Sequence, residues 1–438
     1  MIMDRVSDRS SRARPGPAPL AATVLGLVAL TVQAGSGQQV DPRLVELLEA
    51  HRHAVTIEDG RLGGPGGDLL TEAGRAARFA LLGEEHGIGE IPLFAAAWFR
   101  SLIPGGYRHL AVEVGPDAGA ILDSLARLGP DALATFQEAR PPGFPFFILE
   151  SESRLLADAR GALPHAPDVI WGIDYDILGD RYLFPILESA ATTEEAREVV
   201  AGVRRAADEG LRQVVETGNP ATLLLWSSPD EPFDRLRAAL DPPRGSRADR
   251  VIETMRETTA INRLFMSGDN WESNRRRASW IKRTMAEHLA NARAAGEAEP
   301  RVMVKLGANH LYRGLNQTRQ YDVGAMLSGI AEGEGGSSFH LLVVGGPDTR
   351  RSQFNPVSLS YETEPVGMLS VVLPTQSLVL RDMWTLFDFR PLRAAIHERR
   401  VNVTQELFDL AFNFDALLVL TDSTPARPWF DPGTVLRR

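Results

Sequence analysis

The chain has 438 residues, of which 44% are hydrophobic and 24% charged, and it contains no Cys. This length suits one large α/β domain with an insertion, or two domains, and the lack of Cys excludes disulfides, zinc–thiolate sites and thiol nucleophiles. The net charge of -10 disfavours nucleic acid as a partner, because binding it needs a cationic face.

The first 34 residues are predicted to be an export signal peptide. A basic region is followed by an apolar run from Leu20 to Val32, and Val32-Gln33-Ala34 then fits a small-residue cleavage site. The basic region contains four arginines, Arg5, Arg9, Arg12 and Arg14. The apolar run is a poor transmembrane span because of its length. We expect a periplasmic or secreted protein without a stable membrane span after signal removal; an uncleaved N-terminal anchor is the less favoured alternative.

Residues 35–78 are predicted to be a helical lead-in, with one helix from Pro42 to His53 and a shorter helix after a Gly/Pro-rich loop. From residue 79 onward, strand-like and helix-like segments alternate, which predicts an α/β fold with a central, mostly parallel sheet flanked by helices. Most of the predicted strands are near-continuous apolar runs, typical of strands covered on both faces. The strands are Phe79–Gly83, His109–Val114, Val169–Ile173, Val302–Leu306, Phe339–Val344 and Ala416–Leu420. The helices are Ile91–Leu102, Asp117–Leu128, Ser151–Ala162, Asn274–Ala295 and Pro391–Arg399.

Residues 182–249 differ from this alternation, because they are charged, follow a helical period and carry no strand signals. Glu194 to Val215 is predicted to be one amphipathic helix, and Pro220 to Leu240 to contain another. We interpret the region as a helical insertion or cap over the carboxyl edge of the sheet; a structural excursion is the alternative. The α/β domain then consists of residues 79–181 and 250–438.

A short motif, G-x-x-H, occurs twice, each time directly after a predicted strand. The first copy is Gly83-Glu-Glu-His86 and the second is Gly307-Ala-Asn-His310. A strand that stops at a Gly and at once presents a His places an imidazole at the carboxyl edge of a sheet, where ligands of open α/β sheets bind. Two such copies, far apart in the chain, indicate one crevice to which both halves of the chain contribute residues.

Polar side chains follow four of the predicted strands. In chain order the strand ends present Glu84 with His86, then Glu113, then Asp174, and finally Asn309 with His310. Each carboxylate follows an apolar run, so we expect it to be partly buried, with a pKa that is sensitive to its partners. A lone residue of this kind is more often a turn or cap residue. The matched context of the two histidines is what distinguishes them.

Two chemistries suit this set of residues, and the sequence leaves both open. A His oriented by a carboxylate is a general base that can activate water for attack on an ester or amide carbonyl. Alternatively, two His and one or two carboxylates form a site for Zn²⁺ or Mn²⁺ with an open position for water. The candidate metal ligands are His86, Glu113 and His310.

Two cationic residues join the candidate site. Lys305 lies within a predicted strand, and a buried Lys needs a carboxylate partner, which the strand-end residues would supply. The helix before that strand carries several arginines, most of which should form a solvated face. We expect Arg277 to turn inward and hold a substrate carboxylate or an oxyanion.

These motifs resemble those of the erythromycin esterase family. Leu82-Gly-Glu-Glu-His-Gly-Ile-Gly-Glu90, followed by Gly106-Tyr-Arg-His-Leu-Ala-Val-Glu113, is similar to the opening of that family, and Trp171-Gly-Ile-Asp174 to its third strand. Lys305-Leu-Gly-Ala-Asn-His310 resembles its later strand end, and residues 414–426 its closing strand. The resemblance spans roughly residues 79 to 426. Paired G-x-x-H motifs also mark the wider superfamily, with the TraB/TIKI proteins and the ChaN-type haem-binding lipoproteins.

The resemblance implies a hydrolytic centre in which His86 matches the general base, with Glu84, Glu113 and His310 around it. Glu90 matches a family glutamate four residues after that His. The close spacing of Gly-Glu and His, with Glu85 alone between them, is nearer to the ChaN and TraB branches. We therefore predict an exported hydrolase that acts on a small-molecule ester, lactone or amide, with its metal dependence left open.

A haem or small-cofactor binding protein of the ChaN type is the alternative function. Tyr175, Tyr182 and Tyr312 are expected near the crevice, and a Tyr can serve as an axial haem ligand. Because the chain has no Cys, such a haem would be bound non-covalently.

Overall fold

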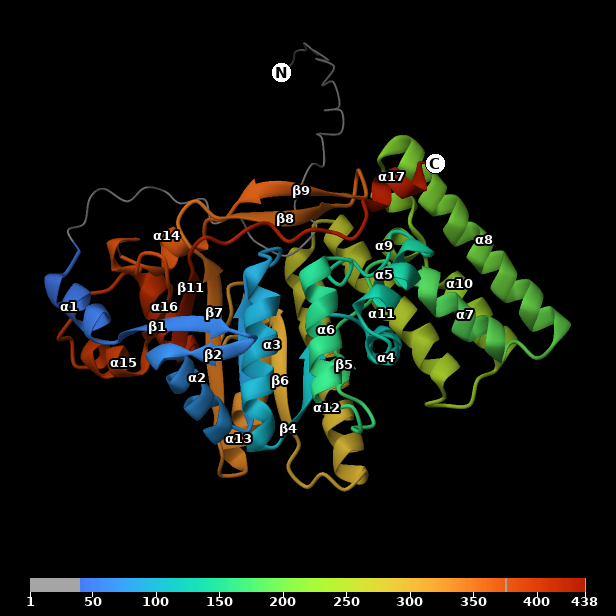
Figure 1. The fold of residues 1–438 in the computed structure, drawn as a ribbon. Helices are drawn as coiled ribbons and strands as arrows, with labels where there is room; N and C mark the ends of the chain where they lie inside the picture. The colour runs from blue at the N-terminus through green and yellow to red at the C-terminus, as the bar shows by residue number, and fades with distance from the viewer. Residues whose placement is uncertain (1–39, 375, 438) are drawn as a thin grey trace, which may run out of the picture.

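The computed structural model describes residues 40–374 and 376–437, so the predicted export signal lies outside the described residues. Its centre is a nine-stranded sheet in the order β2-β1-β10-β11-β7-β3-β6-β4-β5 (Figure 1). From β11 to β5 all neighbouring strands are parallel, whereas β10, β1 and β2 extend the sheet by antiparallel pairing. The strands are β1 (Arg52–Glu58), β2 (Arg61–Gly63), β3 (Phe79–Glu84), β4 (Tyr107–Val112), β5 (Ile170–Gly172), β6 (Arg301–Gly307), β7 (Ser338–Gly345), β10 (Trp384–Asp388) and β11 (Ala416–Leu420). The predicted α/β class is confirmed.

The six predicted strands correspond to β3, β4, β5, β6, β7 and β11. They could be recognised because they are covered on both faces; every residue of β3 and β11 is buried. The prediction of a helix from Pro42 to His53 was wrong at its end. The helix stops at Ala50, and Arg52–Glu58 forms β1 instead. Most of β1 is only partly buried, so its pairing with β10, rather than an apolar pattern, defines it as a strand.

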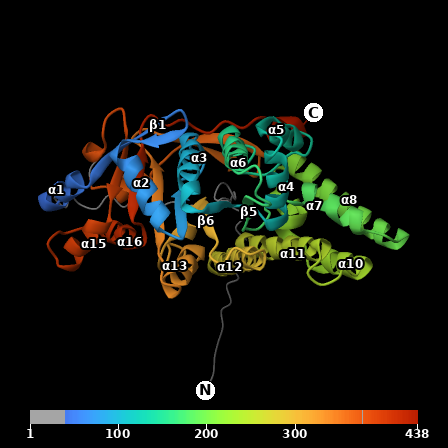
Figure 2. The ribbon, with the colours of Figure 1, turned by 60° about the horizontal axis from the view of Figure 1, so that its bottom comes forward.

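Helices cover both faces of the sheet (Figure 2). One apolar core joins the sheet to α2 (Gly64–Ala76), α3 (Glu90–Leu102), α4 (Pro116–Ala126), α5 (Pro130–Glu138) and α6 (Glu150–Ala162). The opposite core contains α1 (Pro42–Ala50), α12 (Asn270–Ala294), α13 (Val323–Gly333), α15 (Arg390–His397) and α16 (Gln405–Asn413). Side chains along β6 alternate between the two cores, with Met303 in the first and Val302 and Val304 in the second. Lys305 therefore points toward α3 and α6.

A helical region lies beyond β5, at one end of the sheet (Figures 1 and 2). It consists of α7 (Asp180–Ala190), α8 (Glu194–Thr217), α9 (Leu224–Ser227), α10 (Glu231–Leu240) and α11 (Arg247–Met266). Residues 182–249 are thus helical and carry no strand, as the sequence indicates, and a role as a cap stays a prediction. Within the described part of the chain, no helix combines the length and apolar character that crossing a membrane would require.

The carboxyl edge of the sheet is crossed by a separate hairpin, β8 (Arg350–Asn355) and β9 (Ser360–Pro365) (Figure 1). The N–H of Ser352 donates to the carbonyl oxygen of Gly87 over 2.9 Å. Gly87 has φ +83°, and a Cβ there would overlap the backbone of Ser352. The glycine after the first G-x-x-H motif therefore lets the hairpin lie directly on this edge. Two short helices, α14 (Met368–Val372) and α17 (Pro432–Leu436), complete the fold.

Candidate active site

The two G-x-x-H motifs start side by side, because β3 and β6 are adjacent parallel strands in which Glu84 pairs with Gly307. Both histidines approach Glu113, which follows the neighbouring strand β4. The Nε2 atom of His86 lies 3.4 Å from one Glu113 oxygen, and the Nε2 atom of His310 lies 3.9 Å from the other. The two imidazoles therefore meet on the two oxygens of a single carboxylate.

Each imidazole is held on its far side by a second carboxylate. The Nδ1 atom of His86 lies 2.9 Å from Glu84 Oε1, and the Nδ1 atom of His310 lies 2.8 Å from Asp322 Oδ2. A carboxylate on Nδ1 fixes the orientation of the ring and directs Nε2 toward the site. The ring of Phe146 stacks on His86 with centroids 4.5 Å apart. Burial lowers the pKa of His310, but the charge and hydrogen bond of Asp322 together with the charge of Glu113 outweigh it, so the pKa is raised.

Glu113 stays ionised at the centre of this arrangement. It accepts the backbone N–H of Gly307 and a hydrogen bond from Arg277 Nη2, each over 2.7 Å. Burial alone would raise the pKa of Glu113. The charges of His86, Arg277 and His310, together with the Gly307 N–H, instead lower the pKa to about 2. A carboxylate of this kind can orient and stabilise cations but cannot supply a proton at neutral pH.

Arg277 turns inward from α12, whereas its neighbours on that helix stay in water. Its side chain is 13% exposed, compared with 39% for Arg276. Besides Glu113, it binds Asp174, with Nε 3.1 Å from Oδ1, and its guanidinium lies over the ring of Tyr175. Burial raises the pKa of Asp174 even against the charge of Arg277. Arg277 thus holds two buried strand-end carboxylates of the protein itself, whereas the sequence analysis expected it to hold a substrate carboxylate or an oxyanion.

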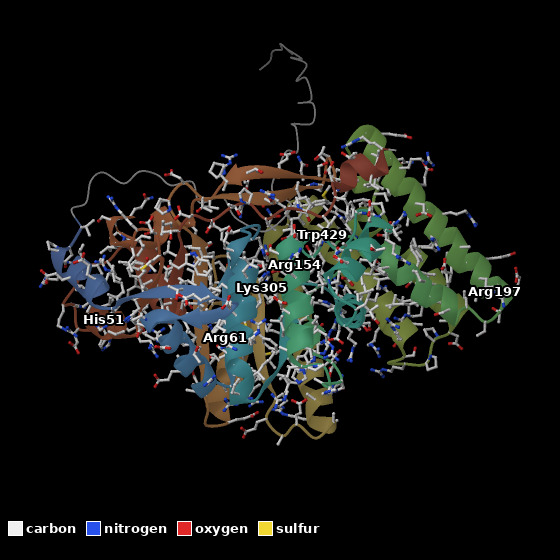
Figure 3. All side chains as sticks on the ribbon, in the orientation of Figure 1. His51, Arg61, Arg154, Arg197, Lys305 and Trp429 are labelled. Atoms are coloured by element: carbon white, nitrogen blue, oxygen red, sulfur yellow. The ribbon has the colours of Figure 1, made fainter. Side chains whose placement is uncertain are left out.

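Lys305 is buried and forms two ion pairs. Its Nζ atom lies 2.7 Å from Glu84 Oε1 and 2.7 Å from Glu152 Oε1, with a side-chain exposure of 3%. Burial lowers the pKa of Lys305, but Glu152 and Glu84 together raise it. Burial raises the pKa of Glu152 to about 7, although Lys305 opposes this. Figure 3 shows Lys305 in the middle of the molecule, with His51 and Arg197 toward its two ends.

Chemical labelling provides a check on this placement, because Lys282 and Lys305 are the two lysines of the chain. We expect reductive methylation of the native protein to modify Lys282, which donates to the Tyr321 carbonyl at the surface, and to leave Lys305 unmodified until the protein is unfolded. Mass spectrometry of proteolytic peptides measures both. Equal modification of the two lysines in the native protein would contradict the burial of Lys305.

Two predicted site residues do not reach the histidines. Glu90 begins α3, and its carboxylate accepts the N–H and the hydroxyl of Thr424, each over 2.8 Å. It therefore fixes the segment after β11 to the start of α3. The side chain of Asn309 accepts the N–H of Gln317 over 3.1 Å and orders the loop after β6.

Three further side chains belong to the site and were not predicted from the sequence: Glu152, Asp322 and Phe146. Asp322 precedes α13 and caps it by accepting the N–H of Val323, so an N-cap pattern could have located it. Nothing in the sequence distinguishes Glu152 from Glu150, the other acidic residue in the first turn of α6. Phe146 lies in a loop, and its contact with His86 arises from tertiary packing.

A divalent metal does not fit the centre as it stands. Ligand atoms of Glu113, Asp174 and His310 lie within 4.8 Å of one another, and such a donor set would suit an oxygen- and nitrogen-binding ion. However, Arg277 already occupies both carboxylates. A cation bound there would face a buried guanidinium, and the like charges would repel.

The three tyrosines considered for haem are poor axial ligands. The hydroxyl of Tyr182 donates to Asp176 over 3.0 Å, and Tyr312 packs edge-on against Phe414. Burial raises the pKa of Tyr175 and of Tyr312 to about 12. Forming a phenolate at any of these positions would therefore be costly.

Replacing Gly307 by Ala tests how closely the end of β6 approaches His86. A Cβ at this position would lie 2.6 Å from His86 Nε2, so the ring must move. We expect activity to fall about 10²-fold, as for other small displacements of reacting groups. Gly329→Ala is the matched control, because its Cβ meets nothing within 4 Å in α13 and should stabilise the helix by about 0.5–1 kcal/mol. Unchanged activity in Gly307→Ala would contradict the close approach.

Comparison with known proteins identifies the fold. No family model and no curated protein matches the chain. Among solved structures, a Bacillus cereus protein has a TM-score of 0.54 at 13% identity, covering 88% of this chain and 98% of that one. A succinoglycan biosynthesis protein has a TM-score of 0.54 at 14% identity, covering 90% and 100%. A mutant of the erythromycin esterase EreC in its open conformation has a TM-score of 0.53 at 16% identity, covering 82% and 93%. The chain therefore has an erythromycin esterase-like α/β fold.

Proposed function

We propose that this protein is an exported hydrolase of small-molecule esters, lactones or amides, with the histidine–carboxylate centre as its active site. One observation carries the proposal: the imidazoles of His86 and His310, each held by its own carboxylate, both approach the ionised Glu113. These three side chains lie at the carboxyl edge of the sheet, where α/β proteins bind their ligands. The likeness of the fold to that of an erythromycin esterase supports the same reaction class.

In this mechanism His86 is the general base. Its Nε2 takes a proton from water as that water attacks the substrate carbonyl, while Glu84 holds the Nδ1–H. Its side chain is 15% exposed, against 10% for His310, so it is the imidazole more open to water. The imidazolium that forms is stabilised by Glu84 on one side and Glu113 on the other.

His310 is suited to the complementary role of general acid. The pKa of His310 is raised by Asp322 against the effect of burial, so its imidazole retains a proton more readily and can give it to the leaving alcohol or amine. Arg277 keeps Glu113 ionised. Because its Nε and Nη2 are already bound to Asp174 and Glu113, we assign it to holding these carboxylates instead of a substrate carboxylate.

The charge of the centre favours neutral or cationic substrates. Its cations, Lys305 and Arg277, are each paired with two carboxylates. An anionic substrate would meet the remaining negative potential without a free counter-charge.

Hydrolysis assays test the proposal. We expect the protein to hydrolyse neutral aryl esters or macrolactones at a rate that does not change when a chelator is added. An anionic counterpart of the same ester should be hydrolysed more slowly. His397→Asn, which changes an exposed histidine, should behave as the wild type. A lack of turnover across neutral, cationic and anionic substrates would contradict the hydrolase assignment, and loss of activity on chelation would contradict the metal-free mechanism.

A further inference from the structure

We propose that Lys305 and Glu152 are positioning residues that fix the general base His86 through Glu84. This inference rests on the proposed hydrolase function for its kinetic meaning, but its structural claim can be tested without any substrate. The contacts run in series from α6 to the site. Glu152 holds Lys305 over 2.7 Å, Lys305 holds Glu84 over 2.7 Å, and Glu84 holds His86 Nδ1 over 2.9 Å.

The sheet places these groups on one face. Leu82 of β3 pairs with Lys305 of β6, and Leu82 belongs to the apolar core on the side of α3 and α6. Because side chains alternate along a strand, Glu84 points to the same side as Leu82. Glu152, in the first turn of α6, approaches from above this face. Three separate elements therefore meet around the Lys305 ammonium group.

The ammonium group controls the state of Glu84. In the part of the chain that the structure describes, the hydrogen-bond partners of the Glu84 carboxylate are Lys305 and His86, both on Oε1. A carboxylate buried to 4% exposure without a cation would become protonated or turn away. Either change would remove the acceptor that fixes Nδ1 of His86. Lys305 thus keeps Glu84 ionised and aimed at the imidazole.

Glu152 in turn keeps Lys305 in place. One of its oxygens binds Lys305, and the other is buried without a hydrogen-bond partner among the described residues. A carboxylate left half-satisfied is costly for stability. Glu152 lies on the far side of Lys305 from Glu84, so the ammonium group is held between two carboxyl groups.

The substrate-free test is the NMR signal of the two carboxylate-bound imidazole protons. A proton shared between His Nδ1 and a carboxylate resonates at low field, so the wild type should show one such signal from His86 and one from His310, assigned with His86→Asn and His310→Asn. We expect Lys305→Met to remove or shift the His86 signal and leave the His310 signal, which Asp322 holds, in place. Lys282→Met, which changes the other lysine, should leave both signals unchanged.

A paired variant separates positioning from stability. Lys305→Met leaves two buried carboxyl groups without a cation and is expected to unfold more easily. In the paired variant, Lys305→Met with Glu152→Gln, the carboxyl group of Glu152 is removed together with the ammonium group. We expect the paired variant to recover stability in urea unfolding and still to lack the His86 signal. Its kcat should fall about 10²-fold with KM changed less than about threefold, and Lys305→Arg should restore part of kcat.

Two results would overturn the proposal: a normal His86 signal in the folded paired variant, or a kcat equal to that of the wild type. If no substrate is turned over by the wild type, the hydrolase proposal fails while the NMR comparison still decides whether Lys305 positions His86. The two failures are therefore distinguishable.

Discussion

Replacing His86 by Asn is expected to lower kcat for ester hydrolysis about 10³-fold, within the range of general acid–base catalysis. The Asn side chain can still approach Glu84 but cannot accept a proton from water at the position of Nε2. KM should change little, because the ring contributes mainly to the transition state. Steady-state kinetics on a neutral aryl ester provide the measurement.

The matched control for this variant is His397→Asn, which makes the same chemical change at an exposed position. Thermal unfolding should show both variants folded. If His86→Asn kept more than about a tenth of the wild-type kcat, which is far above the loss expected for a general base, His86 would not be the base.

Replacing Arg277 by Met is expected to lower the free energy of unfolding by about 3–5 kcal/mol, the usual cost of breaking a buried ion pair. Glu113 and Asp174 would both lose their shared cation while remaining buried, at 7% and 1% exposure. Arg276→Met, one position earlier on the same helix, removes a surface pair with Glu257 and should cost less than about 1 kcal/mol. Urea unfolding at neutral pH measures both; equal losses would contradict the inward role of Arg277.

The stability difference between the wild type and Arg277→Met should depend on pH with a defined sign. The pKa of Glu113 is lowered in the folded protein from its ordinary value of 4.5 to about 2. The resulting stabilisation is therefore complete above about pH 5 and is lost as the pH falls toward 2. Because Arg277 supplies part of it, the two proteins should differ most near neutral pH and converge in acid. A difference that grows on acidification would contradict this account.

The central sheet could be predicted because its strands are buried on both faces. Phe79–Glu84 and Ala416–Leu420 are wholly buried, so each reads as an apolar run in the sequence. The antiparallel extension could not be predicted in the same way. β1 is partly buried over most of its length, so its pairing with the distant strand β10 decides its structure. The hairpin β8–β9 pairs locally, but it has several exposed positions and therefore no continuous apolar run in the sequence.

The core of the candidate site followed from one geometrical rule, that residues after parallel strands gather at one edge. Glu84 is the last residue of β3, and Glu113, Asp174 and His310 follow β4, β5 and β6 within three residues. These side chains do meet at that edge. The rule could not find Glu152, which reaches the site from a helix through Lys305. The rule also could not show that Arg277 binds two carboxylates of the protein itself. These ion pairs depend on the directions of the side chains, which the spacing of residues along the sequence does not give.

A double-mutant cycle on kcat with His86→Asn, His310→Asn and the combined variant tests most directly whether the two imidazoles act together in one site. If both imidazoles act on one substrate in one pocket, we expect the two losses in kcat to be strongly non-additive, so that the combined variant is about as slow as the slower single variant. Losses that multiply, as for two independent sites, would contradict the convergence of the two histidines on Glu113.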